Sequence, residues 1–136
     1  EGWCAGLQLS RVRVSTPVEV GNNAWLECDY EENVDQLYTL KWYNGLNEFY
    51  RWTPAEQPQV KVFSAPGITV DKDMSHKGRV RLRDVRMITA NKKFRCEISA
   101  EAPSFHTDSR VASMTVIDPP DESPFISPTL KDYRVN

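Results

Sequence analysis

Cys4, Cys28 and Cys96 are the residues of this 136-residue chain best suited to covalent chemistry or metal binding. Cys28 and Cys96 lie 68 positions apart, each within a strand-like run of residues (24–30 and 94–98). Such a pair forms either a disulfide that closes a long loop, or two buried thiols of a cytosolic protein. No CxxC pair occurs, and His76 and His106 are far apart in the chain, so the ligand spacing of a zinc site is missing.

Cys4 has no obvious partner in the sequence. It pairs with another chain, or with a cysteine outside this sequence, or it belongs to a segment that is removed. The third reading rests on Cys4-Ala5-Gly6, which places small residues where a signal peptidase needs them. Cleavage after Gly6 would start the mature chain at Leu7, where strand patterning begins.

The segment Asp71-Lys72-Asp73-Met74-Ser75 begins like a calcium loop. His76 then stands where the loop needs glycine, and Leu82 stands where it needs glutamate, so we expect a solvated turn. The neighbouring His76, Ser75 and Asp73 do not have the geometry of a catalytic triad. The sequence also holds no glycine-rich phosphate loop, so we expect no enzyme activity, no metal and no cofactor.

Composition excludes several classes of protein. The chain has 17 Lys+Arg against 19 Asp+Glu, a net charge of −2, which argues against a nucleic-acid binder or a polybasic membrane-surface module. An apolar fraction of 40% with 10% aromatics is too high for a disordered chain. No apolar run reaches the roughly 18 residues of a spanning helix, so we expect no membrane segment in this chain.

Short strands with turn signals between them fill most of the sequence. We expect strands over 7–14, 24–30, 38–43, 48–52, 60–63, 67–71, 79–85, 94–100 and 111–117, with the Asn44-Gly45 pair forming a hairpin turn. No long stretch has a clean helical period. About nine such strands predict an all-β antiparallel sandwich over residues 7–118. Residues 119–136 begin with a proline-rich polar linker, and we expect them to lead into the truncated start of a second domain.

The spacing of three residues selects one kind of sandwich. Trp42 follows Cys28 by 14 residues, and the long interval from Trp42 to Cys96 has room for four further strands. This is the pattern of an immunoglobulin variable-type (V-set) Greek-key sandwich, in which a disulfide joins the two sheets beside a buried tryptophan. We therefore expect a Cys28–Cys96 disulfide, with Trp42, Leu82 and Phe94 in the core. Phe94 stands where a tyrosine usually ties the preceding corner, so we expect packing and backbone bonds alone to hold that corner.

Several segments resemble the insect beaten path family of neuronal immunoglobulin proteins. The resemblance lies in Leu40-Lys41-Trp42-Tyr43, in Glu48-Phe49-Tyr50-Arg51 and, most specifically, in residues 95–107, Arg-Cys-Glu-Ile-Ser-Ala-Glu-Ala-Pro-Ser-Phe-His-Thr. It covers about residues 7–118, and residues 124–136 resemble the start of that family's second immunoglobulin domain. Lys92-Lys93-Phe94 departs from the family's Ser-Gly-x-Tyr, which leaves the family member undetermined.

The resemblance implies a secreted or cell-surface, and so extracellular, protein. It further implies heterophilic binding to receptors of the sidestep family, in axon guidance and synaptic partner choice. Homophilic adhesion and a soluble immune-type variable domain are the alternatives. The second is disfavoured because the loops are not rich in Gly, Ser and Tyr.

Strand alternation indicates which residues face a partner. Because Trp42 and Cys96 point into the core, their strand neighbours point outward. In the strand 48–52 either Phe49 and Arg51 or Tyr50 and Trp52 face out, and the family pattern favours the first pair. The predicted partner-binding residues are Lys41, Tyr43, Phe49, Arg51, Arg95, Glu97, Ser99, Phe105 and His106. The competing interpretation is a wetted sheet face with ordinary cross-strand pairs.

Overall fold

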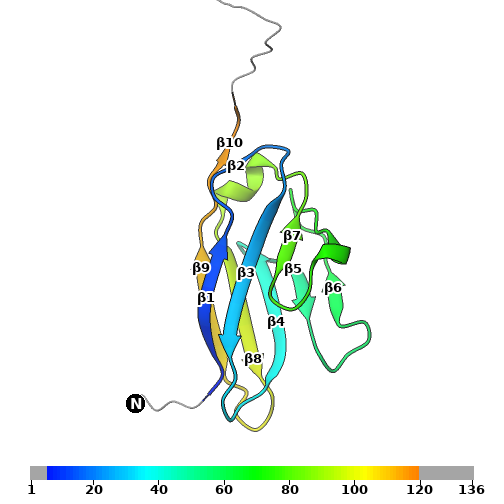
Figure 1. The fold of residues 1–136 in the computed structure, drawn as a ribbon, viewed down its shortest axis with the longest axis vertical. Coiled ribbons are helices and arrows are strands. Elements are labelled where there is room, and N and C mark those ends of the chain that lie inside the picture. Colours follow the sequence, from blue (N-terminus) through cyan, green and yellow to red (C-terminus); the bar gives the residue numbers. More distant parts are fainter. Residues whose placement is uncertain (1–5, 120–136) are drawn as a thin grey trace, which may run out of the picture.

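A computed structural model describes residues 6–119 of the chain as a β-sandwich (Figure 1). The interpretations of Cys4 and of the segment beyond residue 119 lie outside the described residues. The strands are β1 (Gln8–Val14), β2 (Val18–Glu19), β3 (Ala24–Glu31), β4 (Leu37–Asn44), β5 (Asn47–Trp52), β6 (Val60–Val62), β7 (Val80–Leu82), β8 (Phe94–Ala100), β9 (Thr107–Ala112) and β10 (Val116–Ile117). Two 3-10 helices, Lys72–Met74 and Met87–Asn91, complete the elements.

Two sheets form the layers of the sandwich. The small sheet has the order β1-β3-β7, and the large sheet has the order β6-β5-β4-β8-β9, with antiparallel pairing throughout both. Figure 1 shows the small sheet in front of the large one. A short parallel pair, β10 with β2, stands at the end from which the described chain leaves. This arrangement confirms the predicted all-β sandwich.

The core is built around one cross-link between the layers. The Sγ atoms of Cys28 on β3 and Cys96 on β8 are bonded at 2.05 Å, so the two residues are not free thiols. Trp42 is opposite Cys96 in the register of β4 and β8 and has no exposed surface. The other predicted core residues, Leu82 and Phe94, are 1% and 0% exposed. Alternating apolar residues therefore meet between the sheets, as the sequence pattern requires.

Polar side chains hold the corner before Phe94, which corrects the expectation of packing and backbone bonds alone. The buried Asn44 amide donates to the carbonyl of Thr89 at 3.1 Å, and the Thr89 hydroxyl donates to the carbonyl of Arg86 at 2.8 Å. These two bonds secure the 3-10 helix Met87–Asn91. The first bond gives the buried Thr89 carbonyl the donor that it needs, so side chains other than a tyrosine hydroxyl hold this corner.

Some strand boundaries differ from the predicted ones. The segment 67–71 takes part only in two isolated bridges, Ala65 with Ile68 and Val70 with Leu82, rather than forming a strand. The predicted strand 111–117 is divided between β9, which begins earlier at Thr107, and β10. The chain forms these two pieces because β9 pairs with β8 in the large sheet, whereas β10 crosses to pair with β2.

Candidate functional site

The outward side of the large sheet gathers most of the predicted partner-binding residues. We call this surface the large-sheet face and define it by its half-buried and exposed outward residues: Lys41, Tyr43, Glu48, Arg51, Lys61, Phe63, Arg95, Glu97, Ser99, Ser109 and Val111. The predicted partner-binding residues did not include Glu48, Lys61, Phe63, Ser109 and Val111. Lys61 was detectable in principle, since it alternates with the apolar Val60 and Val62.

A charged row crosses the middle of the large-sheet face. Lys61 is opposite Arg51, Arg51 is opposite Lys41, and Lys41 is opposite Glu97 on the other side. Directly opposite residues on neighbouring strands are close enough to interact. Three cations on β6, β5 and β4 therefore stand side by side, with an acidic residue at the end on β8.

Arg51 is held in place by two neighbours. Its Nε and Nη2 atoms donate to the two carboxylate oxygens of Glu48 at 2.7 and 3.1 Å, and this hydrogen bonding raises the pKa of Arg51. Its guanidinium lies 5.2 Å from the ring centre of Phe63. A forked ion pair combined with an aromatic contact fixes the orientation of the arginine. Arg51 is thus presented to solvent with little freedom left to lose on binding.

Arg95 and Tyr43 form a second ordered unit. The guanidinium of Arg95 stacks over the Tyr43 ring at 4.1 Å and donates to Glu97 at 2.6 Å. Partial burial raises the pKa of Tyr43, and the carboxylates of Glu97 and Glu48 raise it further. The phenol therefore stays neutral at physiological pH. It keeps an O–H group that can donate to a partner.

Lys41 differs from the other cations of the large-sheet face. Lys61 pairs with Glu56 at 2.8 Å, and the hydrogen bond from Lys61 lowers the pKa of Glu56. Among residues 6–119 no ion pair includes Lys41, although it is half-buried and central. A half-buried charge gains from a partner that supplies the opposite charge.

The prediction that Phe49 faces outward is wrong. Phe49 has no exposed surface, and its ring packs edge-on against Phe94 with the centroids 6.1 Å apart. The cause is a bulge: the register shifts from Trp42 opposite Tyr50 to Tyr43 opposite Glu48, so Phe49 is the extra residue. An extra residue breaks the strict alternation of a strand. Neither of the two outward pairs considered for this strand is therefore right as a whole. Arg51 faces out, whereas Phe49, Tyr50 and Trp52 are all buried.

The predicted residues at the β8–β9 hairpin lie at one end of the sheet. Phe105 is 69% exposed and adopts a left-handed backbone with φ of 51°, so its side chain projects rather than folding back. His106 is exposed beside it. The neighbouring β3–β4 loop contributes Val34, which is 76% exposed, and a bond from the Glu101 amide to the Gln36 carbonyl joins the two loops. The last predicted residue, Ser99, is half-buried on β8.

Within residues 6–119 no group of three or more His, Cys, Asp and Glu residues is arranged to hold a metal ion. The same part of the chain contains no helix long and apolar enough to cross a membrane.

Comparison with known proteins identifies the fold alone. Neither a family model nor a curated protein sequence matches the chain. Among solved structures, murine CEACAM1b matches with a TM-score of 0.58 at 14% identity, over 86% of this chain and 55% of that one. Murine CRIg matches with a TM-score of 0.54 at 11% identity, over 79% of this chain and 98% of that one. Both similarities agree with the predicted immunoglobulin variable-type sandwich. The chain also has the disulfide that joins the two sheets in such a sandwich.

Proposed function

We propose that this chain is an extracellular recognition domain that binds another protein through the large-sheet face. A sandwich with a disulfide between its sheets suits an oxidising compartment. The observation that carries the proposal is Lys41, a half-buried cation without an ion pair in the described chain, between the ordered Arg51 and Arg95–Tyr43 units. Tyrosine and arginine are enriched among residues that dominate binding energy, and pre-ordered side chains lose little entropy on association.

The partner we propose is a receptor of the sidestep family, in axon guidance and synaptic partner choice. This part of the proposal rests on the resemblance of residues 95–107 and of the β4–β5 segments to the beaten path family. The large-sheet face adds a physical requirement. The partner presents a carboxylate to Lys41 and a flat apolar or aromatic group to the Tyr43–Arg95 stack.

Surface plasmon resonance against a panel of sidestep-type ectodomains tests the proposal. Lys41→Glu places like charge beside Glu97 and in front of the partner carboxylate, so we expect affinity to fall about tenfold or more. Lys72→Glu makes the same charge change at an exposed position of the 3-10 helix Lys72–Met74, which contacts β7 of the small sheet, and serves as the matched control. Equal affinity of both variants and the unaltered chain would show that the partner binds elsewhere.

Analytical sedimentation distinguishes homophilic adhesion from the heterophilic binding proposed here. The large-sheet face carries both charge signs, so a second copy could set its Glu97 against Lys41. A heterophilic domain sediments as a monomer at concentrations where it binds the partner ectodomain. Concentration-dependent dimers that Lys41→Glu abolishes would replace the heterophilic proposal with the homophilic one.

A further inference from the structure

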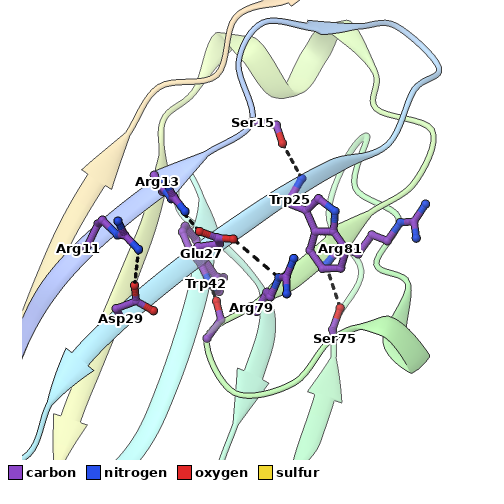
Figure 2. A network of polar contacts seen from close by, with 11 residues as sticks. Arg11, Arg13, Ser15, Trp25, Glu27, Asp29, Trp42, Ser75, Arg79 and Arg81 are labelled. Carbon is purple, nitrogen blue, oxygen red and sulfur yellow. Dashed lines mark hydrogen bonds and ion pairs between the residues drawn. The ribbon is translucent and has the colours of Figure 1, made fainter.

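The outward side of the small sheet carries a cluster of arginines. We call it the small-sheet face, and Figure 2 shows it from outside with Arg11, Arg13, Trp25, Glu27, Asp29, Arg79 and Arg81. The guanidinium groups of Arg79 and Arg81 lie 4.2 and 5.6 Å from the Trp25 ring. Glu27 pairs with Arg13 at 2.7 Å and with Arg79 at 3.8 Å. This surface belongs to the opposite layer from the large-sheet face, so it is independent of the proposed partner site.

Two adjoining hollows run along the small-sheet face. One, of about 610 Å³, is lined by Arg11, Arg13, Lys77 and Arg79 around the carboxylates of Glu27 and Asp29. The other, of about 400 Å³, continues past Trp25 and shares Arg13 and Glu27 with the first. Together they make an open track rather than an enclosed pocket. A track of this form fits a linear chain better than a compact small molecule.

The charge of the track is opposite to that of the whole protein. The four cations of the larger hollow outnumber its two carboxylates, whereas the chain as a whole carries −2. The arginines also retain unused donors. In the described part of the chain, Arg13 donates only through Nε and Arg11 only through one Nη atom, while a guanidinium has five N–H groups. Exposed ion pairs such as Arg11–Asp29 are weak, and a stronger anion competes with them readily.

We propose that this track binds a sulfated polysaccharide of the cell surface. Guanidinium groups match tetrahedral oxyanions through paired N–H donors. A linear polyanion also gains affinity by releasing its condensed counterions, and this gain needs only cations spaced along its path. The small-sheet face offers such spaced cations along the open track. An oxidising extracellular compartment, which the disulfide indicates, is where sulfated polysaccharides occur.

Heparin-affinity chromatography with a salt gradient tests the proposal. Despite its net negative charge, the unaltered chain should be retained at physiological salt. Arg11→Gln with Arg13→Gln should weaken heparin binding about tenfold. The slope of log affinity against log salt, which is negative, should become shallower by about two. The control is Lys92→Gln with Lys93→Gln, which removes the same charge from exposed positions outside the track and should have little effect. Flow-through of the unaltered chain, or an equal effect of both double variants, overturns the proposal.

A gain of affinity provides a second test that does not depend on the stability of the arginine variants. Glu27→Gln with Asp29→Asn removes the two carboxylates that occupy Arg11, Arg13 and Arg79, so the protein should elute from heparin at higher salt. Unchanged or earlier elution would mean that the arginines serve only the sheet. Hyaluronan, which carries carboxylates but no sulfate, should compete poorly. Competition equal to that of heparin would overturn the assignment to sulfate.

Discussion

The indole Nε1 of Trp42 donates a hydrogen bond to the carbonyl of Gly78 at 3.0 Å, which fixes the loop before β7 to the centre of the core. Gly78 is buried directly against β3: a Cβ atom added there would collide with the carbonyl oxygen of Cys28 and come within 3.1 Å of Leu40 Cδ1. The residue is a glycine because two backbones approach closely, not because it needs a left-handed conformation.

Gly78→Ala should therefore destabilise the domain by about 1–3 kcal/mol, because the clash involves backbone that cannot rotate away. Urea denaturation followed by tryptophan fluorescence measures the change. Gly6→Ala is the control, since its added Cβ would meet only side chains, the flexible Asp35 carboxylate at 3.1 Å and the His106 ring at 3.9 Å. A Gly78→Ala variant as stable as the unaltered chain would show that the loop does not rest on β3.

Removal of the cross-link should cost more than any single core bond. Cys28→Ala with Cys96→Ala frees a loop of 68 residues in the unfolded state, which corresponds to about 4 kcal/mol on the chain-entropy model. The measurement is the free energy of unfolding of the double variant against the oxidised parent. The single variants are unsuitable as controls because each leaves a reactive thiol, so reduction of the unaltered chain serves instead. A loss well below 1 kcal/mol in both experiments would contradict the entropic account.

The sequence predicted those features that depend on local period and on the spacing of rare residues. Alternation located most of the strands, and the positions of Cys28, Trp42 and Cys96 predicted the sandwich. What it missed depends on contacts between distant residues. The Asn44–Thr89 bond spans 45 positions and the Trp42–Gly78 bond spans 36, and neither pair leaves a periodic trace in the sequence.

Phe49 shows the same limit within the candidate site. Strand period alone assigns it to one face or the other, but the bulge opposite Trp42 and Tyr43 decides the outcome. A bulge is set by how two strands meet, so a single strand's pattern cannot reveal it. The cluster of arginines on the small-sheet face was missed for a related reason. Trp25 and Arg79 are 54 positions apart and become neighbours only when β3 pairs with β7.

Burial of Tyr50 should make stability sensitive to alkaline pH. Its hydroxyl donates to the Lys77 carbonyl at 2.8 Å, and burial raises its pKa well above the usual value of 10.0. Because the unfolded tyrosine loses its proton first, the folded state is favoured fully below pH 10.0 and loses this contribution as pH rises toward the folded pKa. Tyr50→Phe should be less stable near neutral pH by about 1 kcal/mol, from the lost bond. The stability difference between the two proteins should shrink above pH 10.0, as denaturation at several pH values would show. A constant difference would contradict the assignment.

Substitutions of Phe49 and Tyr43 should separate the contribution of the large sheet to stability from its contribution to partner binding. Phe49→Ala opens a cavity beside Phe94 and should cost about 3–5 kcal/mol of stability, because the removed ring is fully buried. Tyr43→Ala removes a partly exposed ring that stacks only with Arg95 on the surface, so it should cost about 1 kcal/mol or less of stability while weakening partner binding. Thermal unfolding and surface plasmon resonance on both variants measure the two effects. Tyr43→Ala removes the ring on which the Arg95 guanidinium stacks. If a stable Tyr43→Ala variant bound the partner with unchanged affinity, the Tyr43–Arg95 pair would not be part of the contact.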